Sequence, residues 1–179
     1  MTWIETDRLR LRSLAQKDAD IMYDYRNNET CARYQRGQTR DREGIEALVA
    51  RHQDDVLSAE APCMLAAARK DTDEMVGEIV VMPSKGTLSL GYTFSYRHHR
   101  KGYALEALTA LLAWLHARWP DREFICFTEP ENEPSMALLK KLGFQDRGYI
   151  PSKASRVFGK WTTPSTEEEI ARAVREGKG

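Results

Sequence analysis

Hydrophobic and polar residues alternate along this chain with two periods, and the change of period divides it into helices and strands. Leu108, Leu111 and Leu115 recur at helical spacing and predict a helix over 103–117. The apolar run Phe-Ile-Cys-Phe within 123–128 predicts a buried strand. In chain order, the pattern predicts a strand at 8–13, helices at 17–27 and 42–58, strands at 64–69, 75–82 and 87–96, the helix at 103–117, the strand at 123–128, a helix at 132–142, strands at 144–149 and 155–162, and a last helix at 165–177.

This order of elements decides the fold class. Helices and strands are mixed without strict alternation, which excludes a simple doubly wound sheet and favours an α/β (α+β) fold with helices on both faces of a mixed sheet. A length of 179 residues fits one domain spanning 1–179. The polar segment 27–42 is expected to be a loop, and Val56 is expected to face the core from the second helix. Ser-Thr-Glu-Glu at 165–168 is a capping box that opens the last helix.

Composition and charge narrow the class of protein. Hydrophobic residues make up 41% of the chain and charged residues 30%, as in a soluble globular protein. The 27 Lys and Arg residues balance 27 Asp and Glu residues, which argues against duplex nucleic acid as the main partner. The N-terminus is polar, unlike a signal peptide, and no apolar run approaches the ~20 residues that span a bilayer. We therefore expect a cytoplasmic protein with no nucleic-acid partner and no membrane partner.

The cysteines and histidines do not indicate a metal site. Cys31, Cys63 and Cys126 are odd in number and widely spaced, so we expect neither a disulfide framework nor a zinc site. No two of the four histidines have the i, i+4 spacing of a helical metal site. We therefore expect no bound metal.

The most informative segment is 90–108, where a strand runs into a basic loop and then into the longest helix. Gly102 lies at the start of that helix, after Arg100 and Lys101. A helix N-terminus presents unpaired backbone N–H groups with partial positive charge, and a glycine lets an anion approach them. The segment is therefore a candidate cradle for a pyrophosphate. The alternative is a solvated basic turn that caps a core helix.

Three blocks of sequence resemble the GNAT superfamily of N-acetyltransferases. His-Arg-Lys-Gly-Tyr-Ala at 99–104 resembles the Gln/Arg-x-x-Gly-x-Gly/Ala motif that binds acetyl-CoA, with His99 departing at its first position. Its continuation to residue 107 is similar to Gly-Tyr-Ala-x-Glu-Ala of the branch that contains the ribosomal-protein N-terminal acetyltransferases. Pro-Glu-Asn-Glu-Pro-Ser at 130–135, followed by Lys-Leu-Gly-Phe at 141–144, resembles a second motif of that branch. The opening at 5–12 is a weaker match.

The resemblance implies a GNAT-like, mostly antiparallel sheet of about seven strands in which the strands at 87–96 and 123–128 splay apart. Backbone groups of the first of these strands would pair with the pantetheine arm of acetyl-CoA, and backbone N–H groups after residue 99 would hold its pyrophosphate. Asn132 would bond to the pantetheine arm or cap its helix, and both roles are compatible. The residues that the resemblance assigns to acetyl-CoA are Tyr92, Thr93, Phe94, His99, Arg100, Lys101, Gly102, Tyr103, Ala104, Leu105, Asn132 and Ser135.

Two departures from the family pattern bear on catalysis. Many GNAT members have a tyrosine seven residues after the asparagine to protonate the thiolate, and here that position is Leu139. Ser135 is the substitute candidate, or an ordinary first-turn serine. Related enzymes often have a glutamate where this chain has Arg147. Glu129 is then the candidate base, because strand parity places it on the side of 125 and 127, or it is a solvated turn carboxylate.

Two other carboxylates lie near these motifs. Glu78 belongs to a predicted strand, and Glu106 lies in the first turn of the long helix, where it would interact favourably with the helix dipole. Neither is preferred over Glu129 as a base.

These observations support transfer of an acetyl group from acetyl-CoA to a primary amine, either a peptide N-terminus or a small molecule. The alternative is a catalytically weak module of the same fold that binds acyl-CoA and acts as a sensor or partner subunit. Nucleic-acid binding through 97–101 is disfavoured by the zero net charge. Acceptor contacts are expected from 25–42 and 150–156. Within the first of these segments, the residues that either bind an acidic acceptor or are solvated are Arg26, Arg33, Tyr34 and Arg36. The oligomeric state is left open between a monomer and a homodimer.

Overall fold

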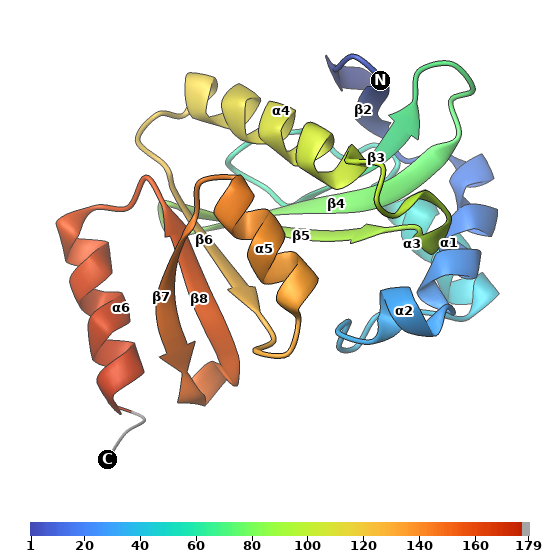
Figure 1. The fold of residues 1–179 in the computed structure, drawn as a ribbon. Helices are drawn as coiled ribbons and strands as arrows, with labels where there is room; N and C mark the ends of the chain where they lie inside the picture. The colour runs from blue at the N-terminus through green and yellow to red at the C-terminus, as the bar shows by residue number, and fades with distance from the viewer. Residues whose placement is uncertain (177–179) are drawn as a thin grey trace.

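The computed structural model describes residues 1–176, and they form one mixed sheet of eight strands with helices on both faces (Figure 1). The strands lie in the order β1-β2-β3-β4-β5-β6-β8-β7. All neighbouring pairs are antiparallel except β5 and β6, which are parallel. The strands are β1 (Thr2–Glu5), β2 (Leu9–Ser13), β3 (Cys63–Arg69), β4 (Met75–Ser84), β5 (Thr87–Phe94), β6 (Glu123–Thr128), β7 (Gln145–Ile150) and β8 (Ser155–Lys160).

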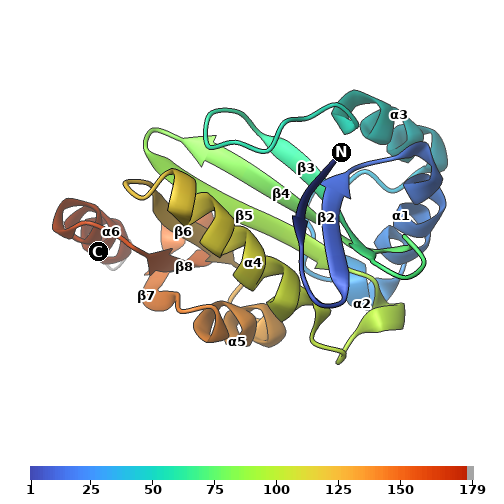
Figure 2. The same cartoon turned by 90° about the horizontal axis from the view of Figure 1, so that it is seen from above.

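Helices cover the two faces of the sheet unequally, as Figures 1 and 2 show. One face carries α4, which crosses the middle of the sheet, and α5 beside it; the other carries α1 and α3 at one end and α6 against β7 and β8. None of the helices within 1–176 is long and apolar enough to cross a membrane. The helices are α1 (Ala19–Arg26), α2 (Glu29–Ala32), α3 (Arg42–His52), α4 (Tyr103–Arg118), α5 (Glu133–Lys141) and α6 (Pro164–Glu176).

The alternation of side chains along β3 shows how one strand serves two cores. Leu65 and Ala67 belong to the large cluster under α4, whereas Met64 and Ala66 belong to the cluster under α1 and α3. All four are buried, because successive side chains of a strand point to opposite faces and helices cover both. The predicted mixed sheet with helices on both faces is therefore confirmed.

The two central strands separate along their length. Their parallel pairing is limited to Thr87 with Glu123 and Leu88 with Phe124. Beyond these pairs β5 continues to pair with β4 as far as Phe94, and β6 continues to pair with β8 as far as Thr128. The splayed central strands predicted from the resemblance are confirmed, and a gap opens between their carboxyl ends.

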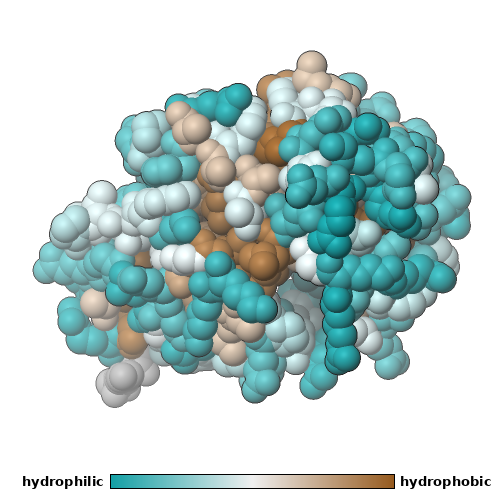
Figure 3. Space-filling model, turned by 45° about the horizontal axis from the view of Figure 1, so that its top comes forward, coloured by the Kyte–Doolittle hydropathy of each residue, from teal (hydrophilic) through white to brown (hydrophobic). Residues whose placement is uncertain are grey.

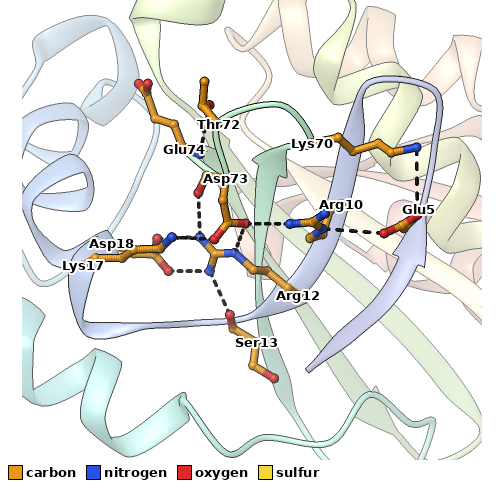
Figure 4. A network of polar contacts seen from close by, with 10 residues as sticks. All are labelled: Glu5, Arg10, Arg12, Ser13, Lys17, Asp18, Lys70, Thr72, Asp73 and Glu74. Atoms are coloured by element: carbon orange, nitrogen blue, oxygen red, sulfur yellow. Dashed lines mark hydrogen bonds and ion pairs between the residues drawn. The ribbon is translucent and has the colours of Figure 1, made fainter.

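A polar network fixes the N-terminal strand pair to the turn between β3 and β4 (Figure 4). The Arg12 guanidinium donates to both carboxylate oxygens of Asp18, at 2.8 and 2.9 Å, and its Nε donates to Asp73 at 3.0 Å. Lys17 also contacts Asp73. Burial acts to raise the pKa of Asp73, but hydrogen bonds from Lys17 and Arg12 outweigh it and lower the pKa to about 2.

The N-terminal third contains two short elements that were not predicted. The expected sheet of about seven strands has eight, because the edge strand β1, which is four residues long and has no regular apolar period, also pairs with β2. The expected loop at 27–42 contains the one-turn helix α2, since the Asn28 side chain accepts a hydrogen bond from the N–H of Thr30 at 3.0 Å.

The second predicted helix also ends earlier than expected. It stops at His52, and Val56, which was predicted to face the core, is 62% exposed. The His52 ring contacts the Asp55 carboxylate at 2.8 Å, and that carboxylate also accepts from the N–H of Met64 at 3.0 Å. These contacts turn the chain toward β3, and local bonds of this kind compete with helix continuation.

The cap of the last helix differs from the predicted capping box. The Thr163 hydroxyl accepts from the N–H of Thr166 at 3.3 Å, and its carbonyl accepts from the N–H of Glu167. Thr163, two residues before the predicted box, is therefore the N-cap of α6. The predicted end of this helix near Gly177 lies outside the described residues.

Candidate active site

The gap between β5 and β6 opens into a groove of about 920 Å³. In the space-filling view, apolar side chains gather in the middle of the molecule, with hydrophilic side chains on both sides (Figure 3). Every residue that the sequence assigned to acetyl-CoA or to catalysis lines this groove, with the exception of Lys101. A smaller hollow of about 410 Å³ lies between α6 and the end of β8, and none of the predicted site residues lines it. The groove at the gap is therefore the candidate site.

Backbone groups of β5 face the gap because the strand has lost its neighbour there. The N–H of Ser95 donates to Val76 of β4 at 2.8 Å, and bonding alternates along an antiparallel ladder, so Tyr92 and Phe94 direct their backbone groups away from β4. Consistent with this, the Tyr92 carbonyl accepts from Gln35 at 3.5 Å. Thr93 has the opposite orientation and lies opposite Glu78 in the register of β4.

His99 braces the strand against the basic loop. Its Nε2 lies 2.8 Å from the carbonyl oxygen of Phe94. A carbonyl can only accept, so Nε2 carries the proton and donates it to this bond. His99 stands where the family motif has Gln or Arg, and it connects the start of the loop to the end of β5 through this hydrogen bond.

The loop that follows places free N–H groups at the start of α4. Arg100 and Gly102 have positive φ angles of 64° and 78°, and Gly102 is the N-cap of α4. The first intrahelical bond runs from the N–H of Glu106 to the carbonyl of Gly102 at 3.0 Å. The N–H groups of Tyr103 and Ala104 therefore have no partner within the helix and carry the positive end of its dipole. This arrangement can bind an anion.

Arg8 supports this loop, and sequence reasoning did not single it out. Its guanidinium donates to the carbonyl of Lys101 at 2.8 Å and lies 4.5 Å from the centre of the Tyr103 ring. Glu106 holds Arg8 through an ion pair of 2.7 Å. The block at 5–12 was the signal that could have found this residue. Glu106 is therefore a structural carboxylate directed at the N-terminal strands. Lys101 takes part through its carbonyl, which accepts the hydrogen bond from Arg8.

Two hydroxyl groups meet across the gap, one from each side. Asn132 caps α5 by accepting from the N–H of Ser135 at 3.2 Å. The Ser135 hydroxyl lies 2.9 Å from the phenol oxygen of Tyr92 on β5. Burial raises the pKa of Tyr92 to about 12, against the effect of the bond to Ser135. The Tyr92 side chain was missed by sequence reasoning, although it shares the strand face of Leu90 and Phe94.

An ion pair crosses the same gap at its open end. Glu129, directly after β6, pairs with the guanidinium of Arg36, which comes from the loop between α2 and α3. Arg36 also approaches the carbonyl of Ala154 at 3.4 Å, and the Tyr34 hydroxyl donates to the carbonyl of Glu131 at 2.9 Å. The loop after α2 therefore reaches across to the connection between β6 and α5.

Arg26 and Glu78 are too deeply buried to take part in the site. Each side chain is 3% exposed, and the guanidinium donates to both carboxylate oxygens at 2.6 and 2.8 Å. Tyr25 donates to the same carboxylate at 2.9 Å. The interpretation of Arg26 as an acceptor contact was wrong, because it belongs to the core under α1.

Metal-ligating side chains do not cluster at this site within the part of the chain that the structure describes. Across residues 1–176 no three His, Cys, Asp or Glu side chains are grouped so that they could hold a metal ion. Cys126 lines the groove, but burial raises the pKa of its thiol to about 11. A thiol with that pKa is protonated at neutral pH and is a poor nucleophile.

Comparison with known proteins places this chain in one family. The family model of the acetyltransferase (GNAT) domain matches residues 8–145, and the chain belongs to the GNAT family of acetyltransferases. The uncharacterised N-acetyltransferase YnaD of Bacillus subtilis is 30% identical over 149 residues, which cover 82% of this chain and 85% of YnaD. The predicted family is therefore confirmed.

Solved structures agree on the fold. A GNAT-family acetyltransferase from Bacillus anthracis superposes with a TM-score of 0.75 at 23% identity, covering 89% of this chain and 96% of the other. RimL, a ribosomal L7/L12 α-N-protein acetyltransferase in complex with coenzyme A, superposes with a TM-score of 0.72 at 16% identity, covering 89% of this chain and 97% of RimL.

Proposed function

We propose that this acetyltransferase moves an acetyl group from acetyl-CoA to a primary amine, which attacks the thioester directly. The observation that carries the proposal is the gap between β5 and β6, with the anion-binding loop at one end and Ser135 and Glu129 on its walls. RimL was solved with coenzyme A, and the fold neighbour MccE with acetyl-CoA and AMP. The groove of about 920 Å³ is large enough for an extended ligand of this kind.

The chain's own groups fit such a donor. The N–H groups that begin α4 would hold the pyrophosphate, and Gly102 presents no Cβ at that point. The backbone groups of Tyr92 and Phe94 would pair with the amide groups of the pantetheine arm, as a peptide adds to a sheet edge. When it is bound, acetyl-CoA supplies the activated acyl carbon, whose bond to sulfur is exchanged for a bond to nitrogen.

Three side chains would then take part in proton transfer. An amine attacks only in its neutral form, and Glu129 would take its proton, directly or through water. Tyr92 keeps its own proton at neutral pH because its pKa is about 12, so it can donate to the Ser135 oxygen. The Ser135 proton is then free to point at the leaving sulfur. This pair would replace the phenol that is missing at Leu139.

The alternative of a non-catalytic acyl-CoA-binding module gives a different result in one assay. Release of free CoA from acetyl-CoA in the presence of primary amines supports the enzyme, whereas binding without release supports the module. The Tyr92–Ser135 hydroxyl pair favours the enzyme, because a module that only binds has no need of a donor at the sulfur position.

Acetyl-CoA is expected to raise the melting temperature of the protein. A ligand that binds only the folded state at a hundredfold excess over its Kd stabilises it by about 2.7 kcal/mol. For a chain of this length that corresponds to about 5–10 °C. Differential scanning fluorimetry with millimolar acetyl-CoA measures the shift, and an unchanged melting temperature would count against the proposed function as a whole.

Substitution at Gly102 provides the matched control for that measurement. Asp and Asn are enriched among the non-glycine residues found at positive φ, so the backbone strain at this position is similar in both variants, and a Cβ would meet only the Arg8 guanidinium at 3.5 Å. Gly102→Asp places a carboxylate where the pyrophosphate would approach, and we expect acetyl-CoA affinity to fall by about 10²-fold, since like charges across an interface cost several kcal/mol. Gly102→Asn adds the same Cβ without the charge, so its acetyl-CoA affinity should fall less than that of Gly102→Asp. Unchanged acetyl-CoA affinity of a folded Gly102→Asp variant would contradict the pyrophosphate assignment.

Removal of either hydroxyl at the gap is expected to slow acetyl transfer without weakening acetyl-CoA binding. A hydrogen bond of this kind contributes about 1–1.5 kcal/mol, so Tyr92→Phe and Ser135→Ala should each lower kcat by about tenfold. The double variant should lose little more than the worse single variant, because the two hydroxyls act as one unit. Steady-state kinetics together with acetyl-CoA titration measure this. Multiplied losses, or a weakened acetyl-CoA Kd, would show that the hydroxyls act separately or only support the fold.

A further inference from the structure

The ion pair between Arg36 and Glu129 lies at the open end of the gap, where an acceptor would enter. Arg36 belongs to the loop between α2 and α3, and Glu129 to the connection between β6 and α5, so the pair joins the two sides of the groove. The Arg36 side chain is 60% exposed and that of Glu129 is 24% exposed. Solvent-exposed ion pairs contribute little to stability, so a charged ligand can replace either partner at little cost.

The surroundings of Arg36 contain charges of both signs. The bond from Glu129 and the charge of the same carboxylate raise the pKa of Arg36, and Glu131 and Tyr149 add to this effect. The only other bond of Arg36 within the described residues is the long one of 3.4 Å to the carbonyl of Ala154. Lys153 precedes Ala154 in the chain, and its ammonium lies 5.0 Å from the centre of the Phe127 ring. The guanidinium is therefore held mainly by one exchangeable carboxylate.

An amine acceptor that gives its proton directly to Glu129 lies beside Arg36, because the guanidinium contacts the Oε1 oxygen of the same carboxylate. The ammonium form of the acceptor and the guanidinium then compete for the negative charge of Glu129. An acceptor with only an amino group would leave Arg36 with less counter-charge at the entrance. An acceptor that also bears a carboxylate would pair with both partners, because a guanidinium presents a planar fork of donors that matches a carboxylate.

We propose that the acceptor is an amine that carries a carboxylate close to its nitrogen, with the ammonium placed at Glu129 and the carboxylate at Arg36. This inference rests on the proposed function, since it assigns the acceptor side of the same groove. It names free amino acids, and peptides whose N-terminal residue is acidic, as the chemical class. Arg36 is then a specificity-determining residue that selects the acceptor and does not take part in acyl transfer.

The test compares two pairs of acceptors that differ only in the carboxylate: L-alanine with ethylamine, and L-phenylalanine with 2-phenylethylamine. We expect the wild-type protein to release CoA at a kcat/KM about 10–100-fold higher for the amino acids, the range expected for hydrogen bonds to charged groups. Arg36→Gln should abolish the part of this preference for amino acids that comes from the protein. The amino acid and the amine differ in intrinsic reactivity, but this difference is the same in both proteins, so the ratio of preferences reports on Arg36 alone.

Charge reversal and a remote arginine sharpen the test. Arg36→Glu should favour a diamine such as 1,3-diaminopropane over L-alanine. Arg42 on α3 forms an exposed ion pair with Asp20 on α1, and Arg42→Gln should keep the wild-type preference. Calorimetric binding of L-phenylalanine to the wild type, weakened in Arg36→Gln, is the readout that does not need turnover. Equal preferences of wild type and Arg36→Gln overturn the acceptor class. If acetyl-CoA still raises the melting temperature in that case, the donor site stands.

Discussion

Glu129→Gln is expected to lower kcat/KM for acetyl transfer by about 10²-fold or more while leaving the fold intact. A single general acid–base group contributes 10²–10⁴-fold, and the amide cannot accept a proton from the attacking amine. The stability should change little, because the Arg36 side chain of the ion pair that is lost is solvent-exposed. Steady-state CoA release and urea unfolding measure the two effects separately.

Glu131→Gln is the matched control for this variant. Glu131 lies two residues further along the same connection and meets the opposite loop through its carbonyl, which accepts from Tyr34. Its carboxylate adds to the local charge in the same way, so general electrostatic effects should appear in both variants, whereas loss of a base should appear only at Glu129. Wild-type kcat/KM in Glu129→Gln would rule out a side-chain base at this position and leave water as the proton acceptor.

Arg26→Met is expected to destabilise the protein by about 3–5 kcal/mol. The substitution leaves the Glu78 carboxylate buried and without its cation, which is far more costly than the loss of an exposed pair. The double variant Arg26→Met with Glu78→Leu removes both charges and should recover most of the stability, although Tyr25 then loses the acceptor of its hydroxyl. Chemical denaturation of the single and double variants measures the difference.

The exposed pair between Arg42 and Asp20 supplies the comparison. Both side chains are at least half exposed, and Arg42→Met should leave the denaturation midpoint almost unchanged. If Arg26→Met cost no more than this, the buried contact would not be an important part of the core. The Arg26 guanidinium also donates to the carbonyl of Thr39 at 2.9 Å, so the single variant is expected to loosen the loop that carries Arg36.

The sequence predicted best those elements that its apolar period determines. The long helix begins at Tyr103 as predicted, and the buried strand Glu123–Thr128 has the predicted bounds, because a strong apolar pattern and clear end signals act together there. It failed where short polar contacts decide the path of the chain, as at α2 and after His52. No apolar period marks a turn fixed by Asn28 or by Asp55.

The candidate site also has a part that the sequence predicted and a part that it did not predict. The loop before α4 and the Asn132 cap are contiguous in sequence, so a motif could identify them. The contact of Tyr92 with Ser135 joins residues 43 positions apart, and that of Arg36 with Glu129 joins residues 93 positions apart. Such contacts depend on the packing of separate elements, and a single sequence carries no signal for the distance between them.

The limited pairing of β5 with β6 has a consequence for the cooperativity of the molecule. The sheet consists of two blocks, β1 to β5 and β6 to β8, whose backbones are joined at only two residue pairs. Separation of the two blocks would break few backbone hydrogen bonds, so the apolar core under α4, to which both blocks contribute side chains, is what holds them together. A ligand that bonds to both walls of the gap would act as a cross-link between two folding units, and its binding energy would oppose their separation.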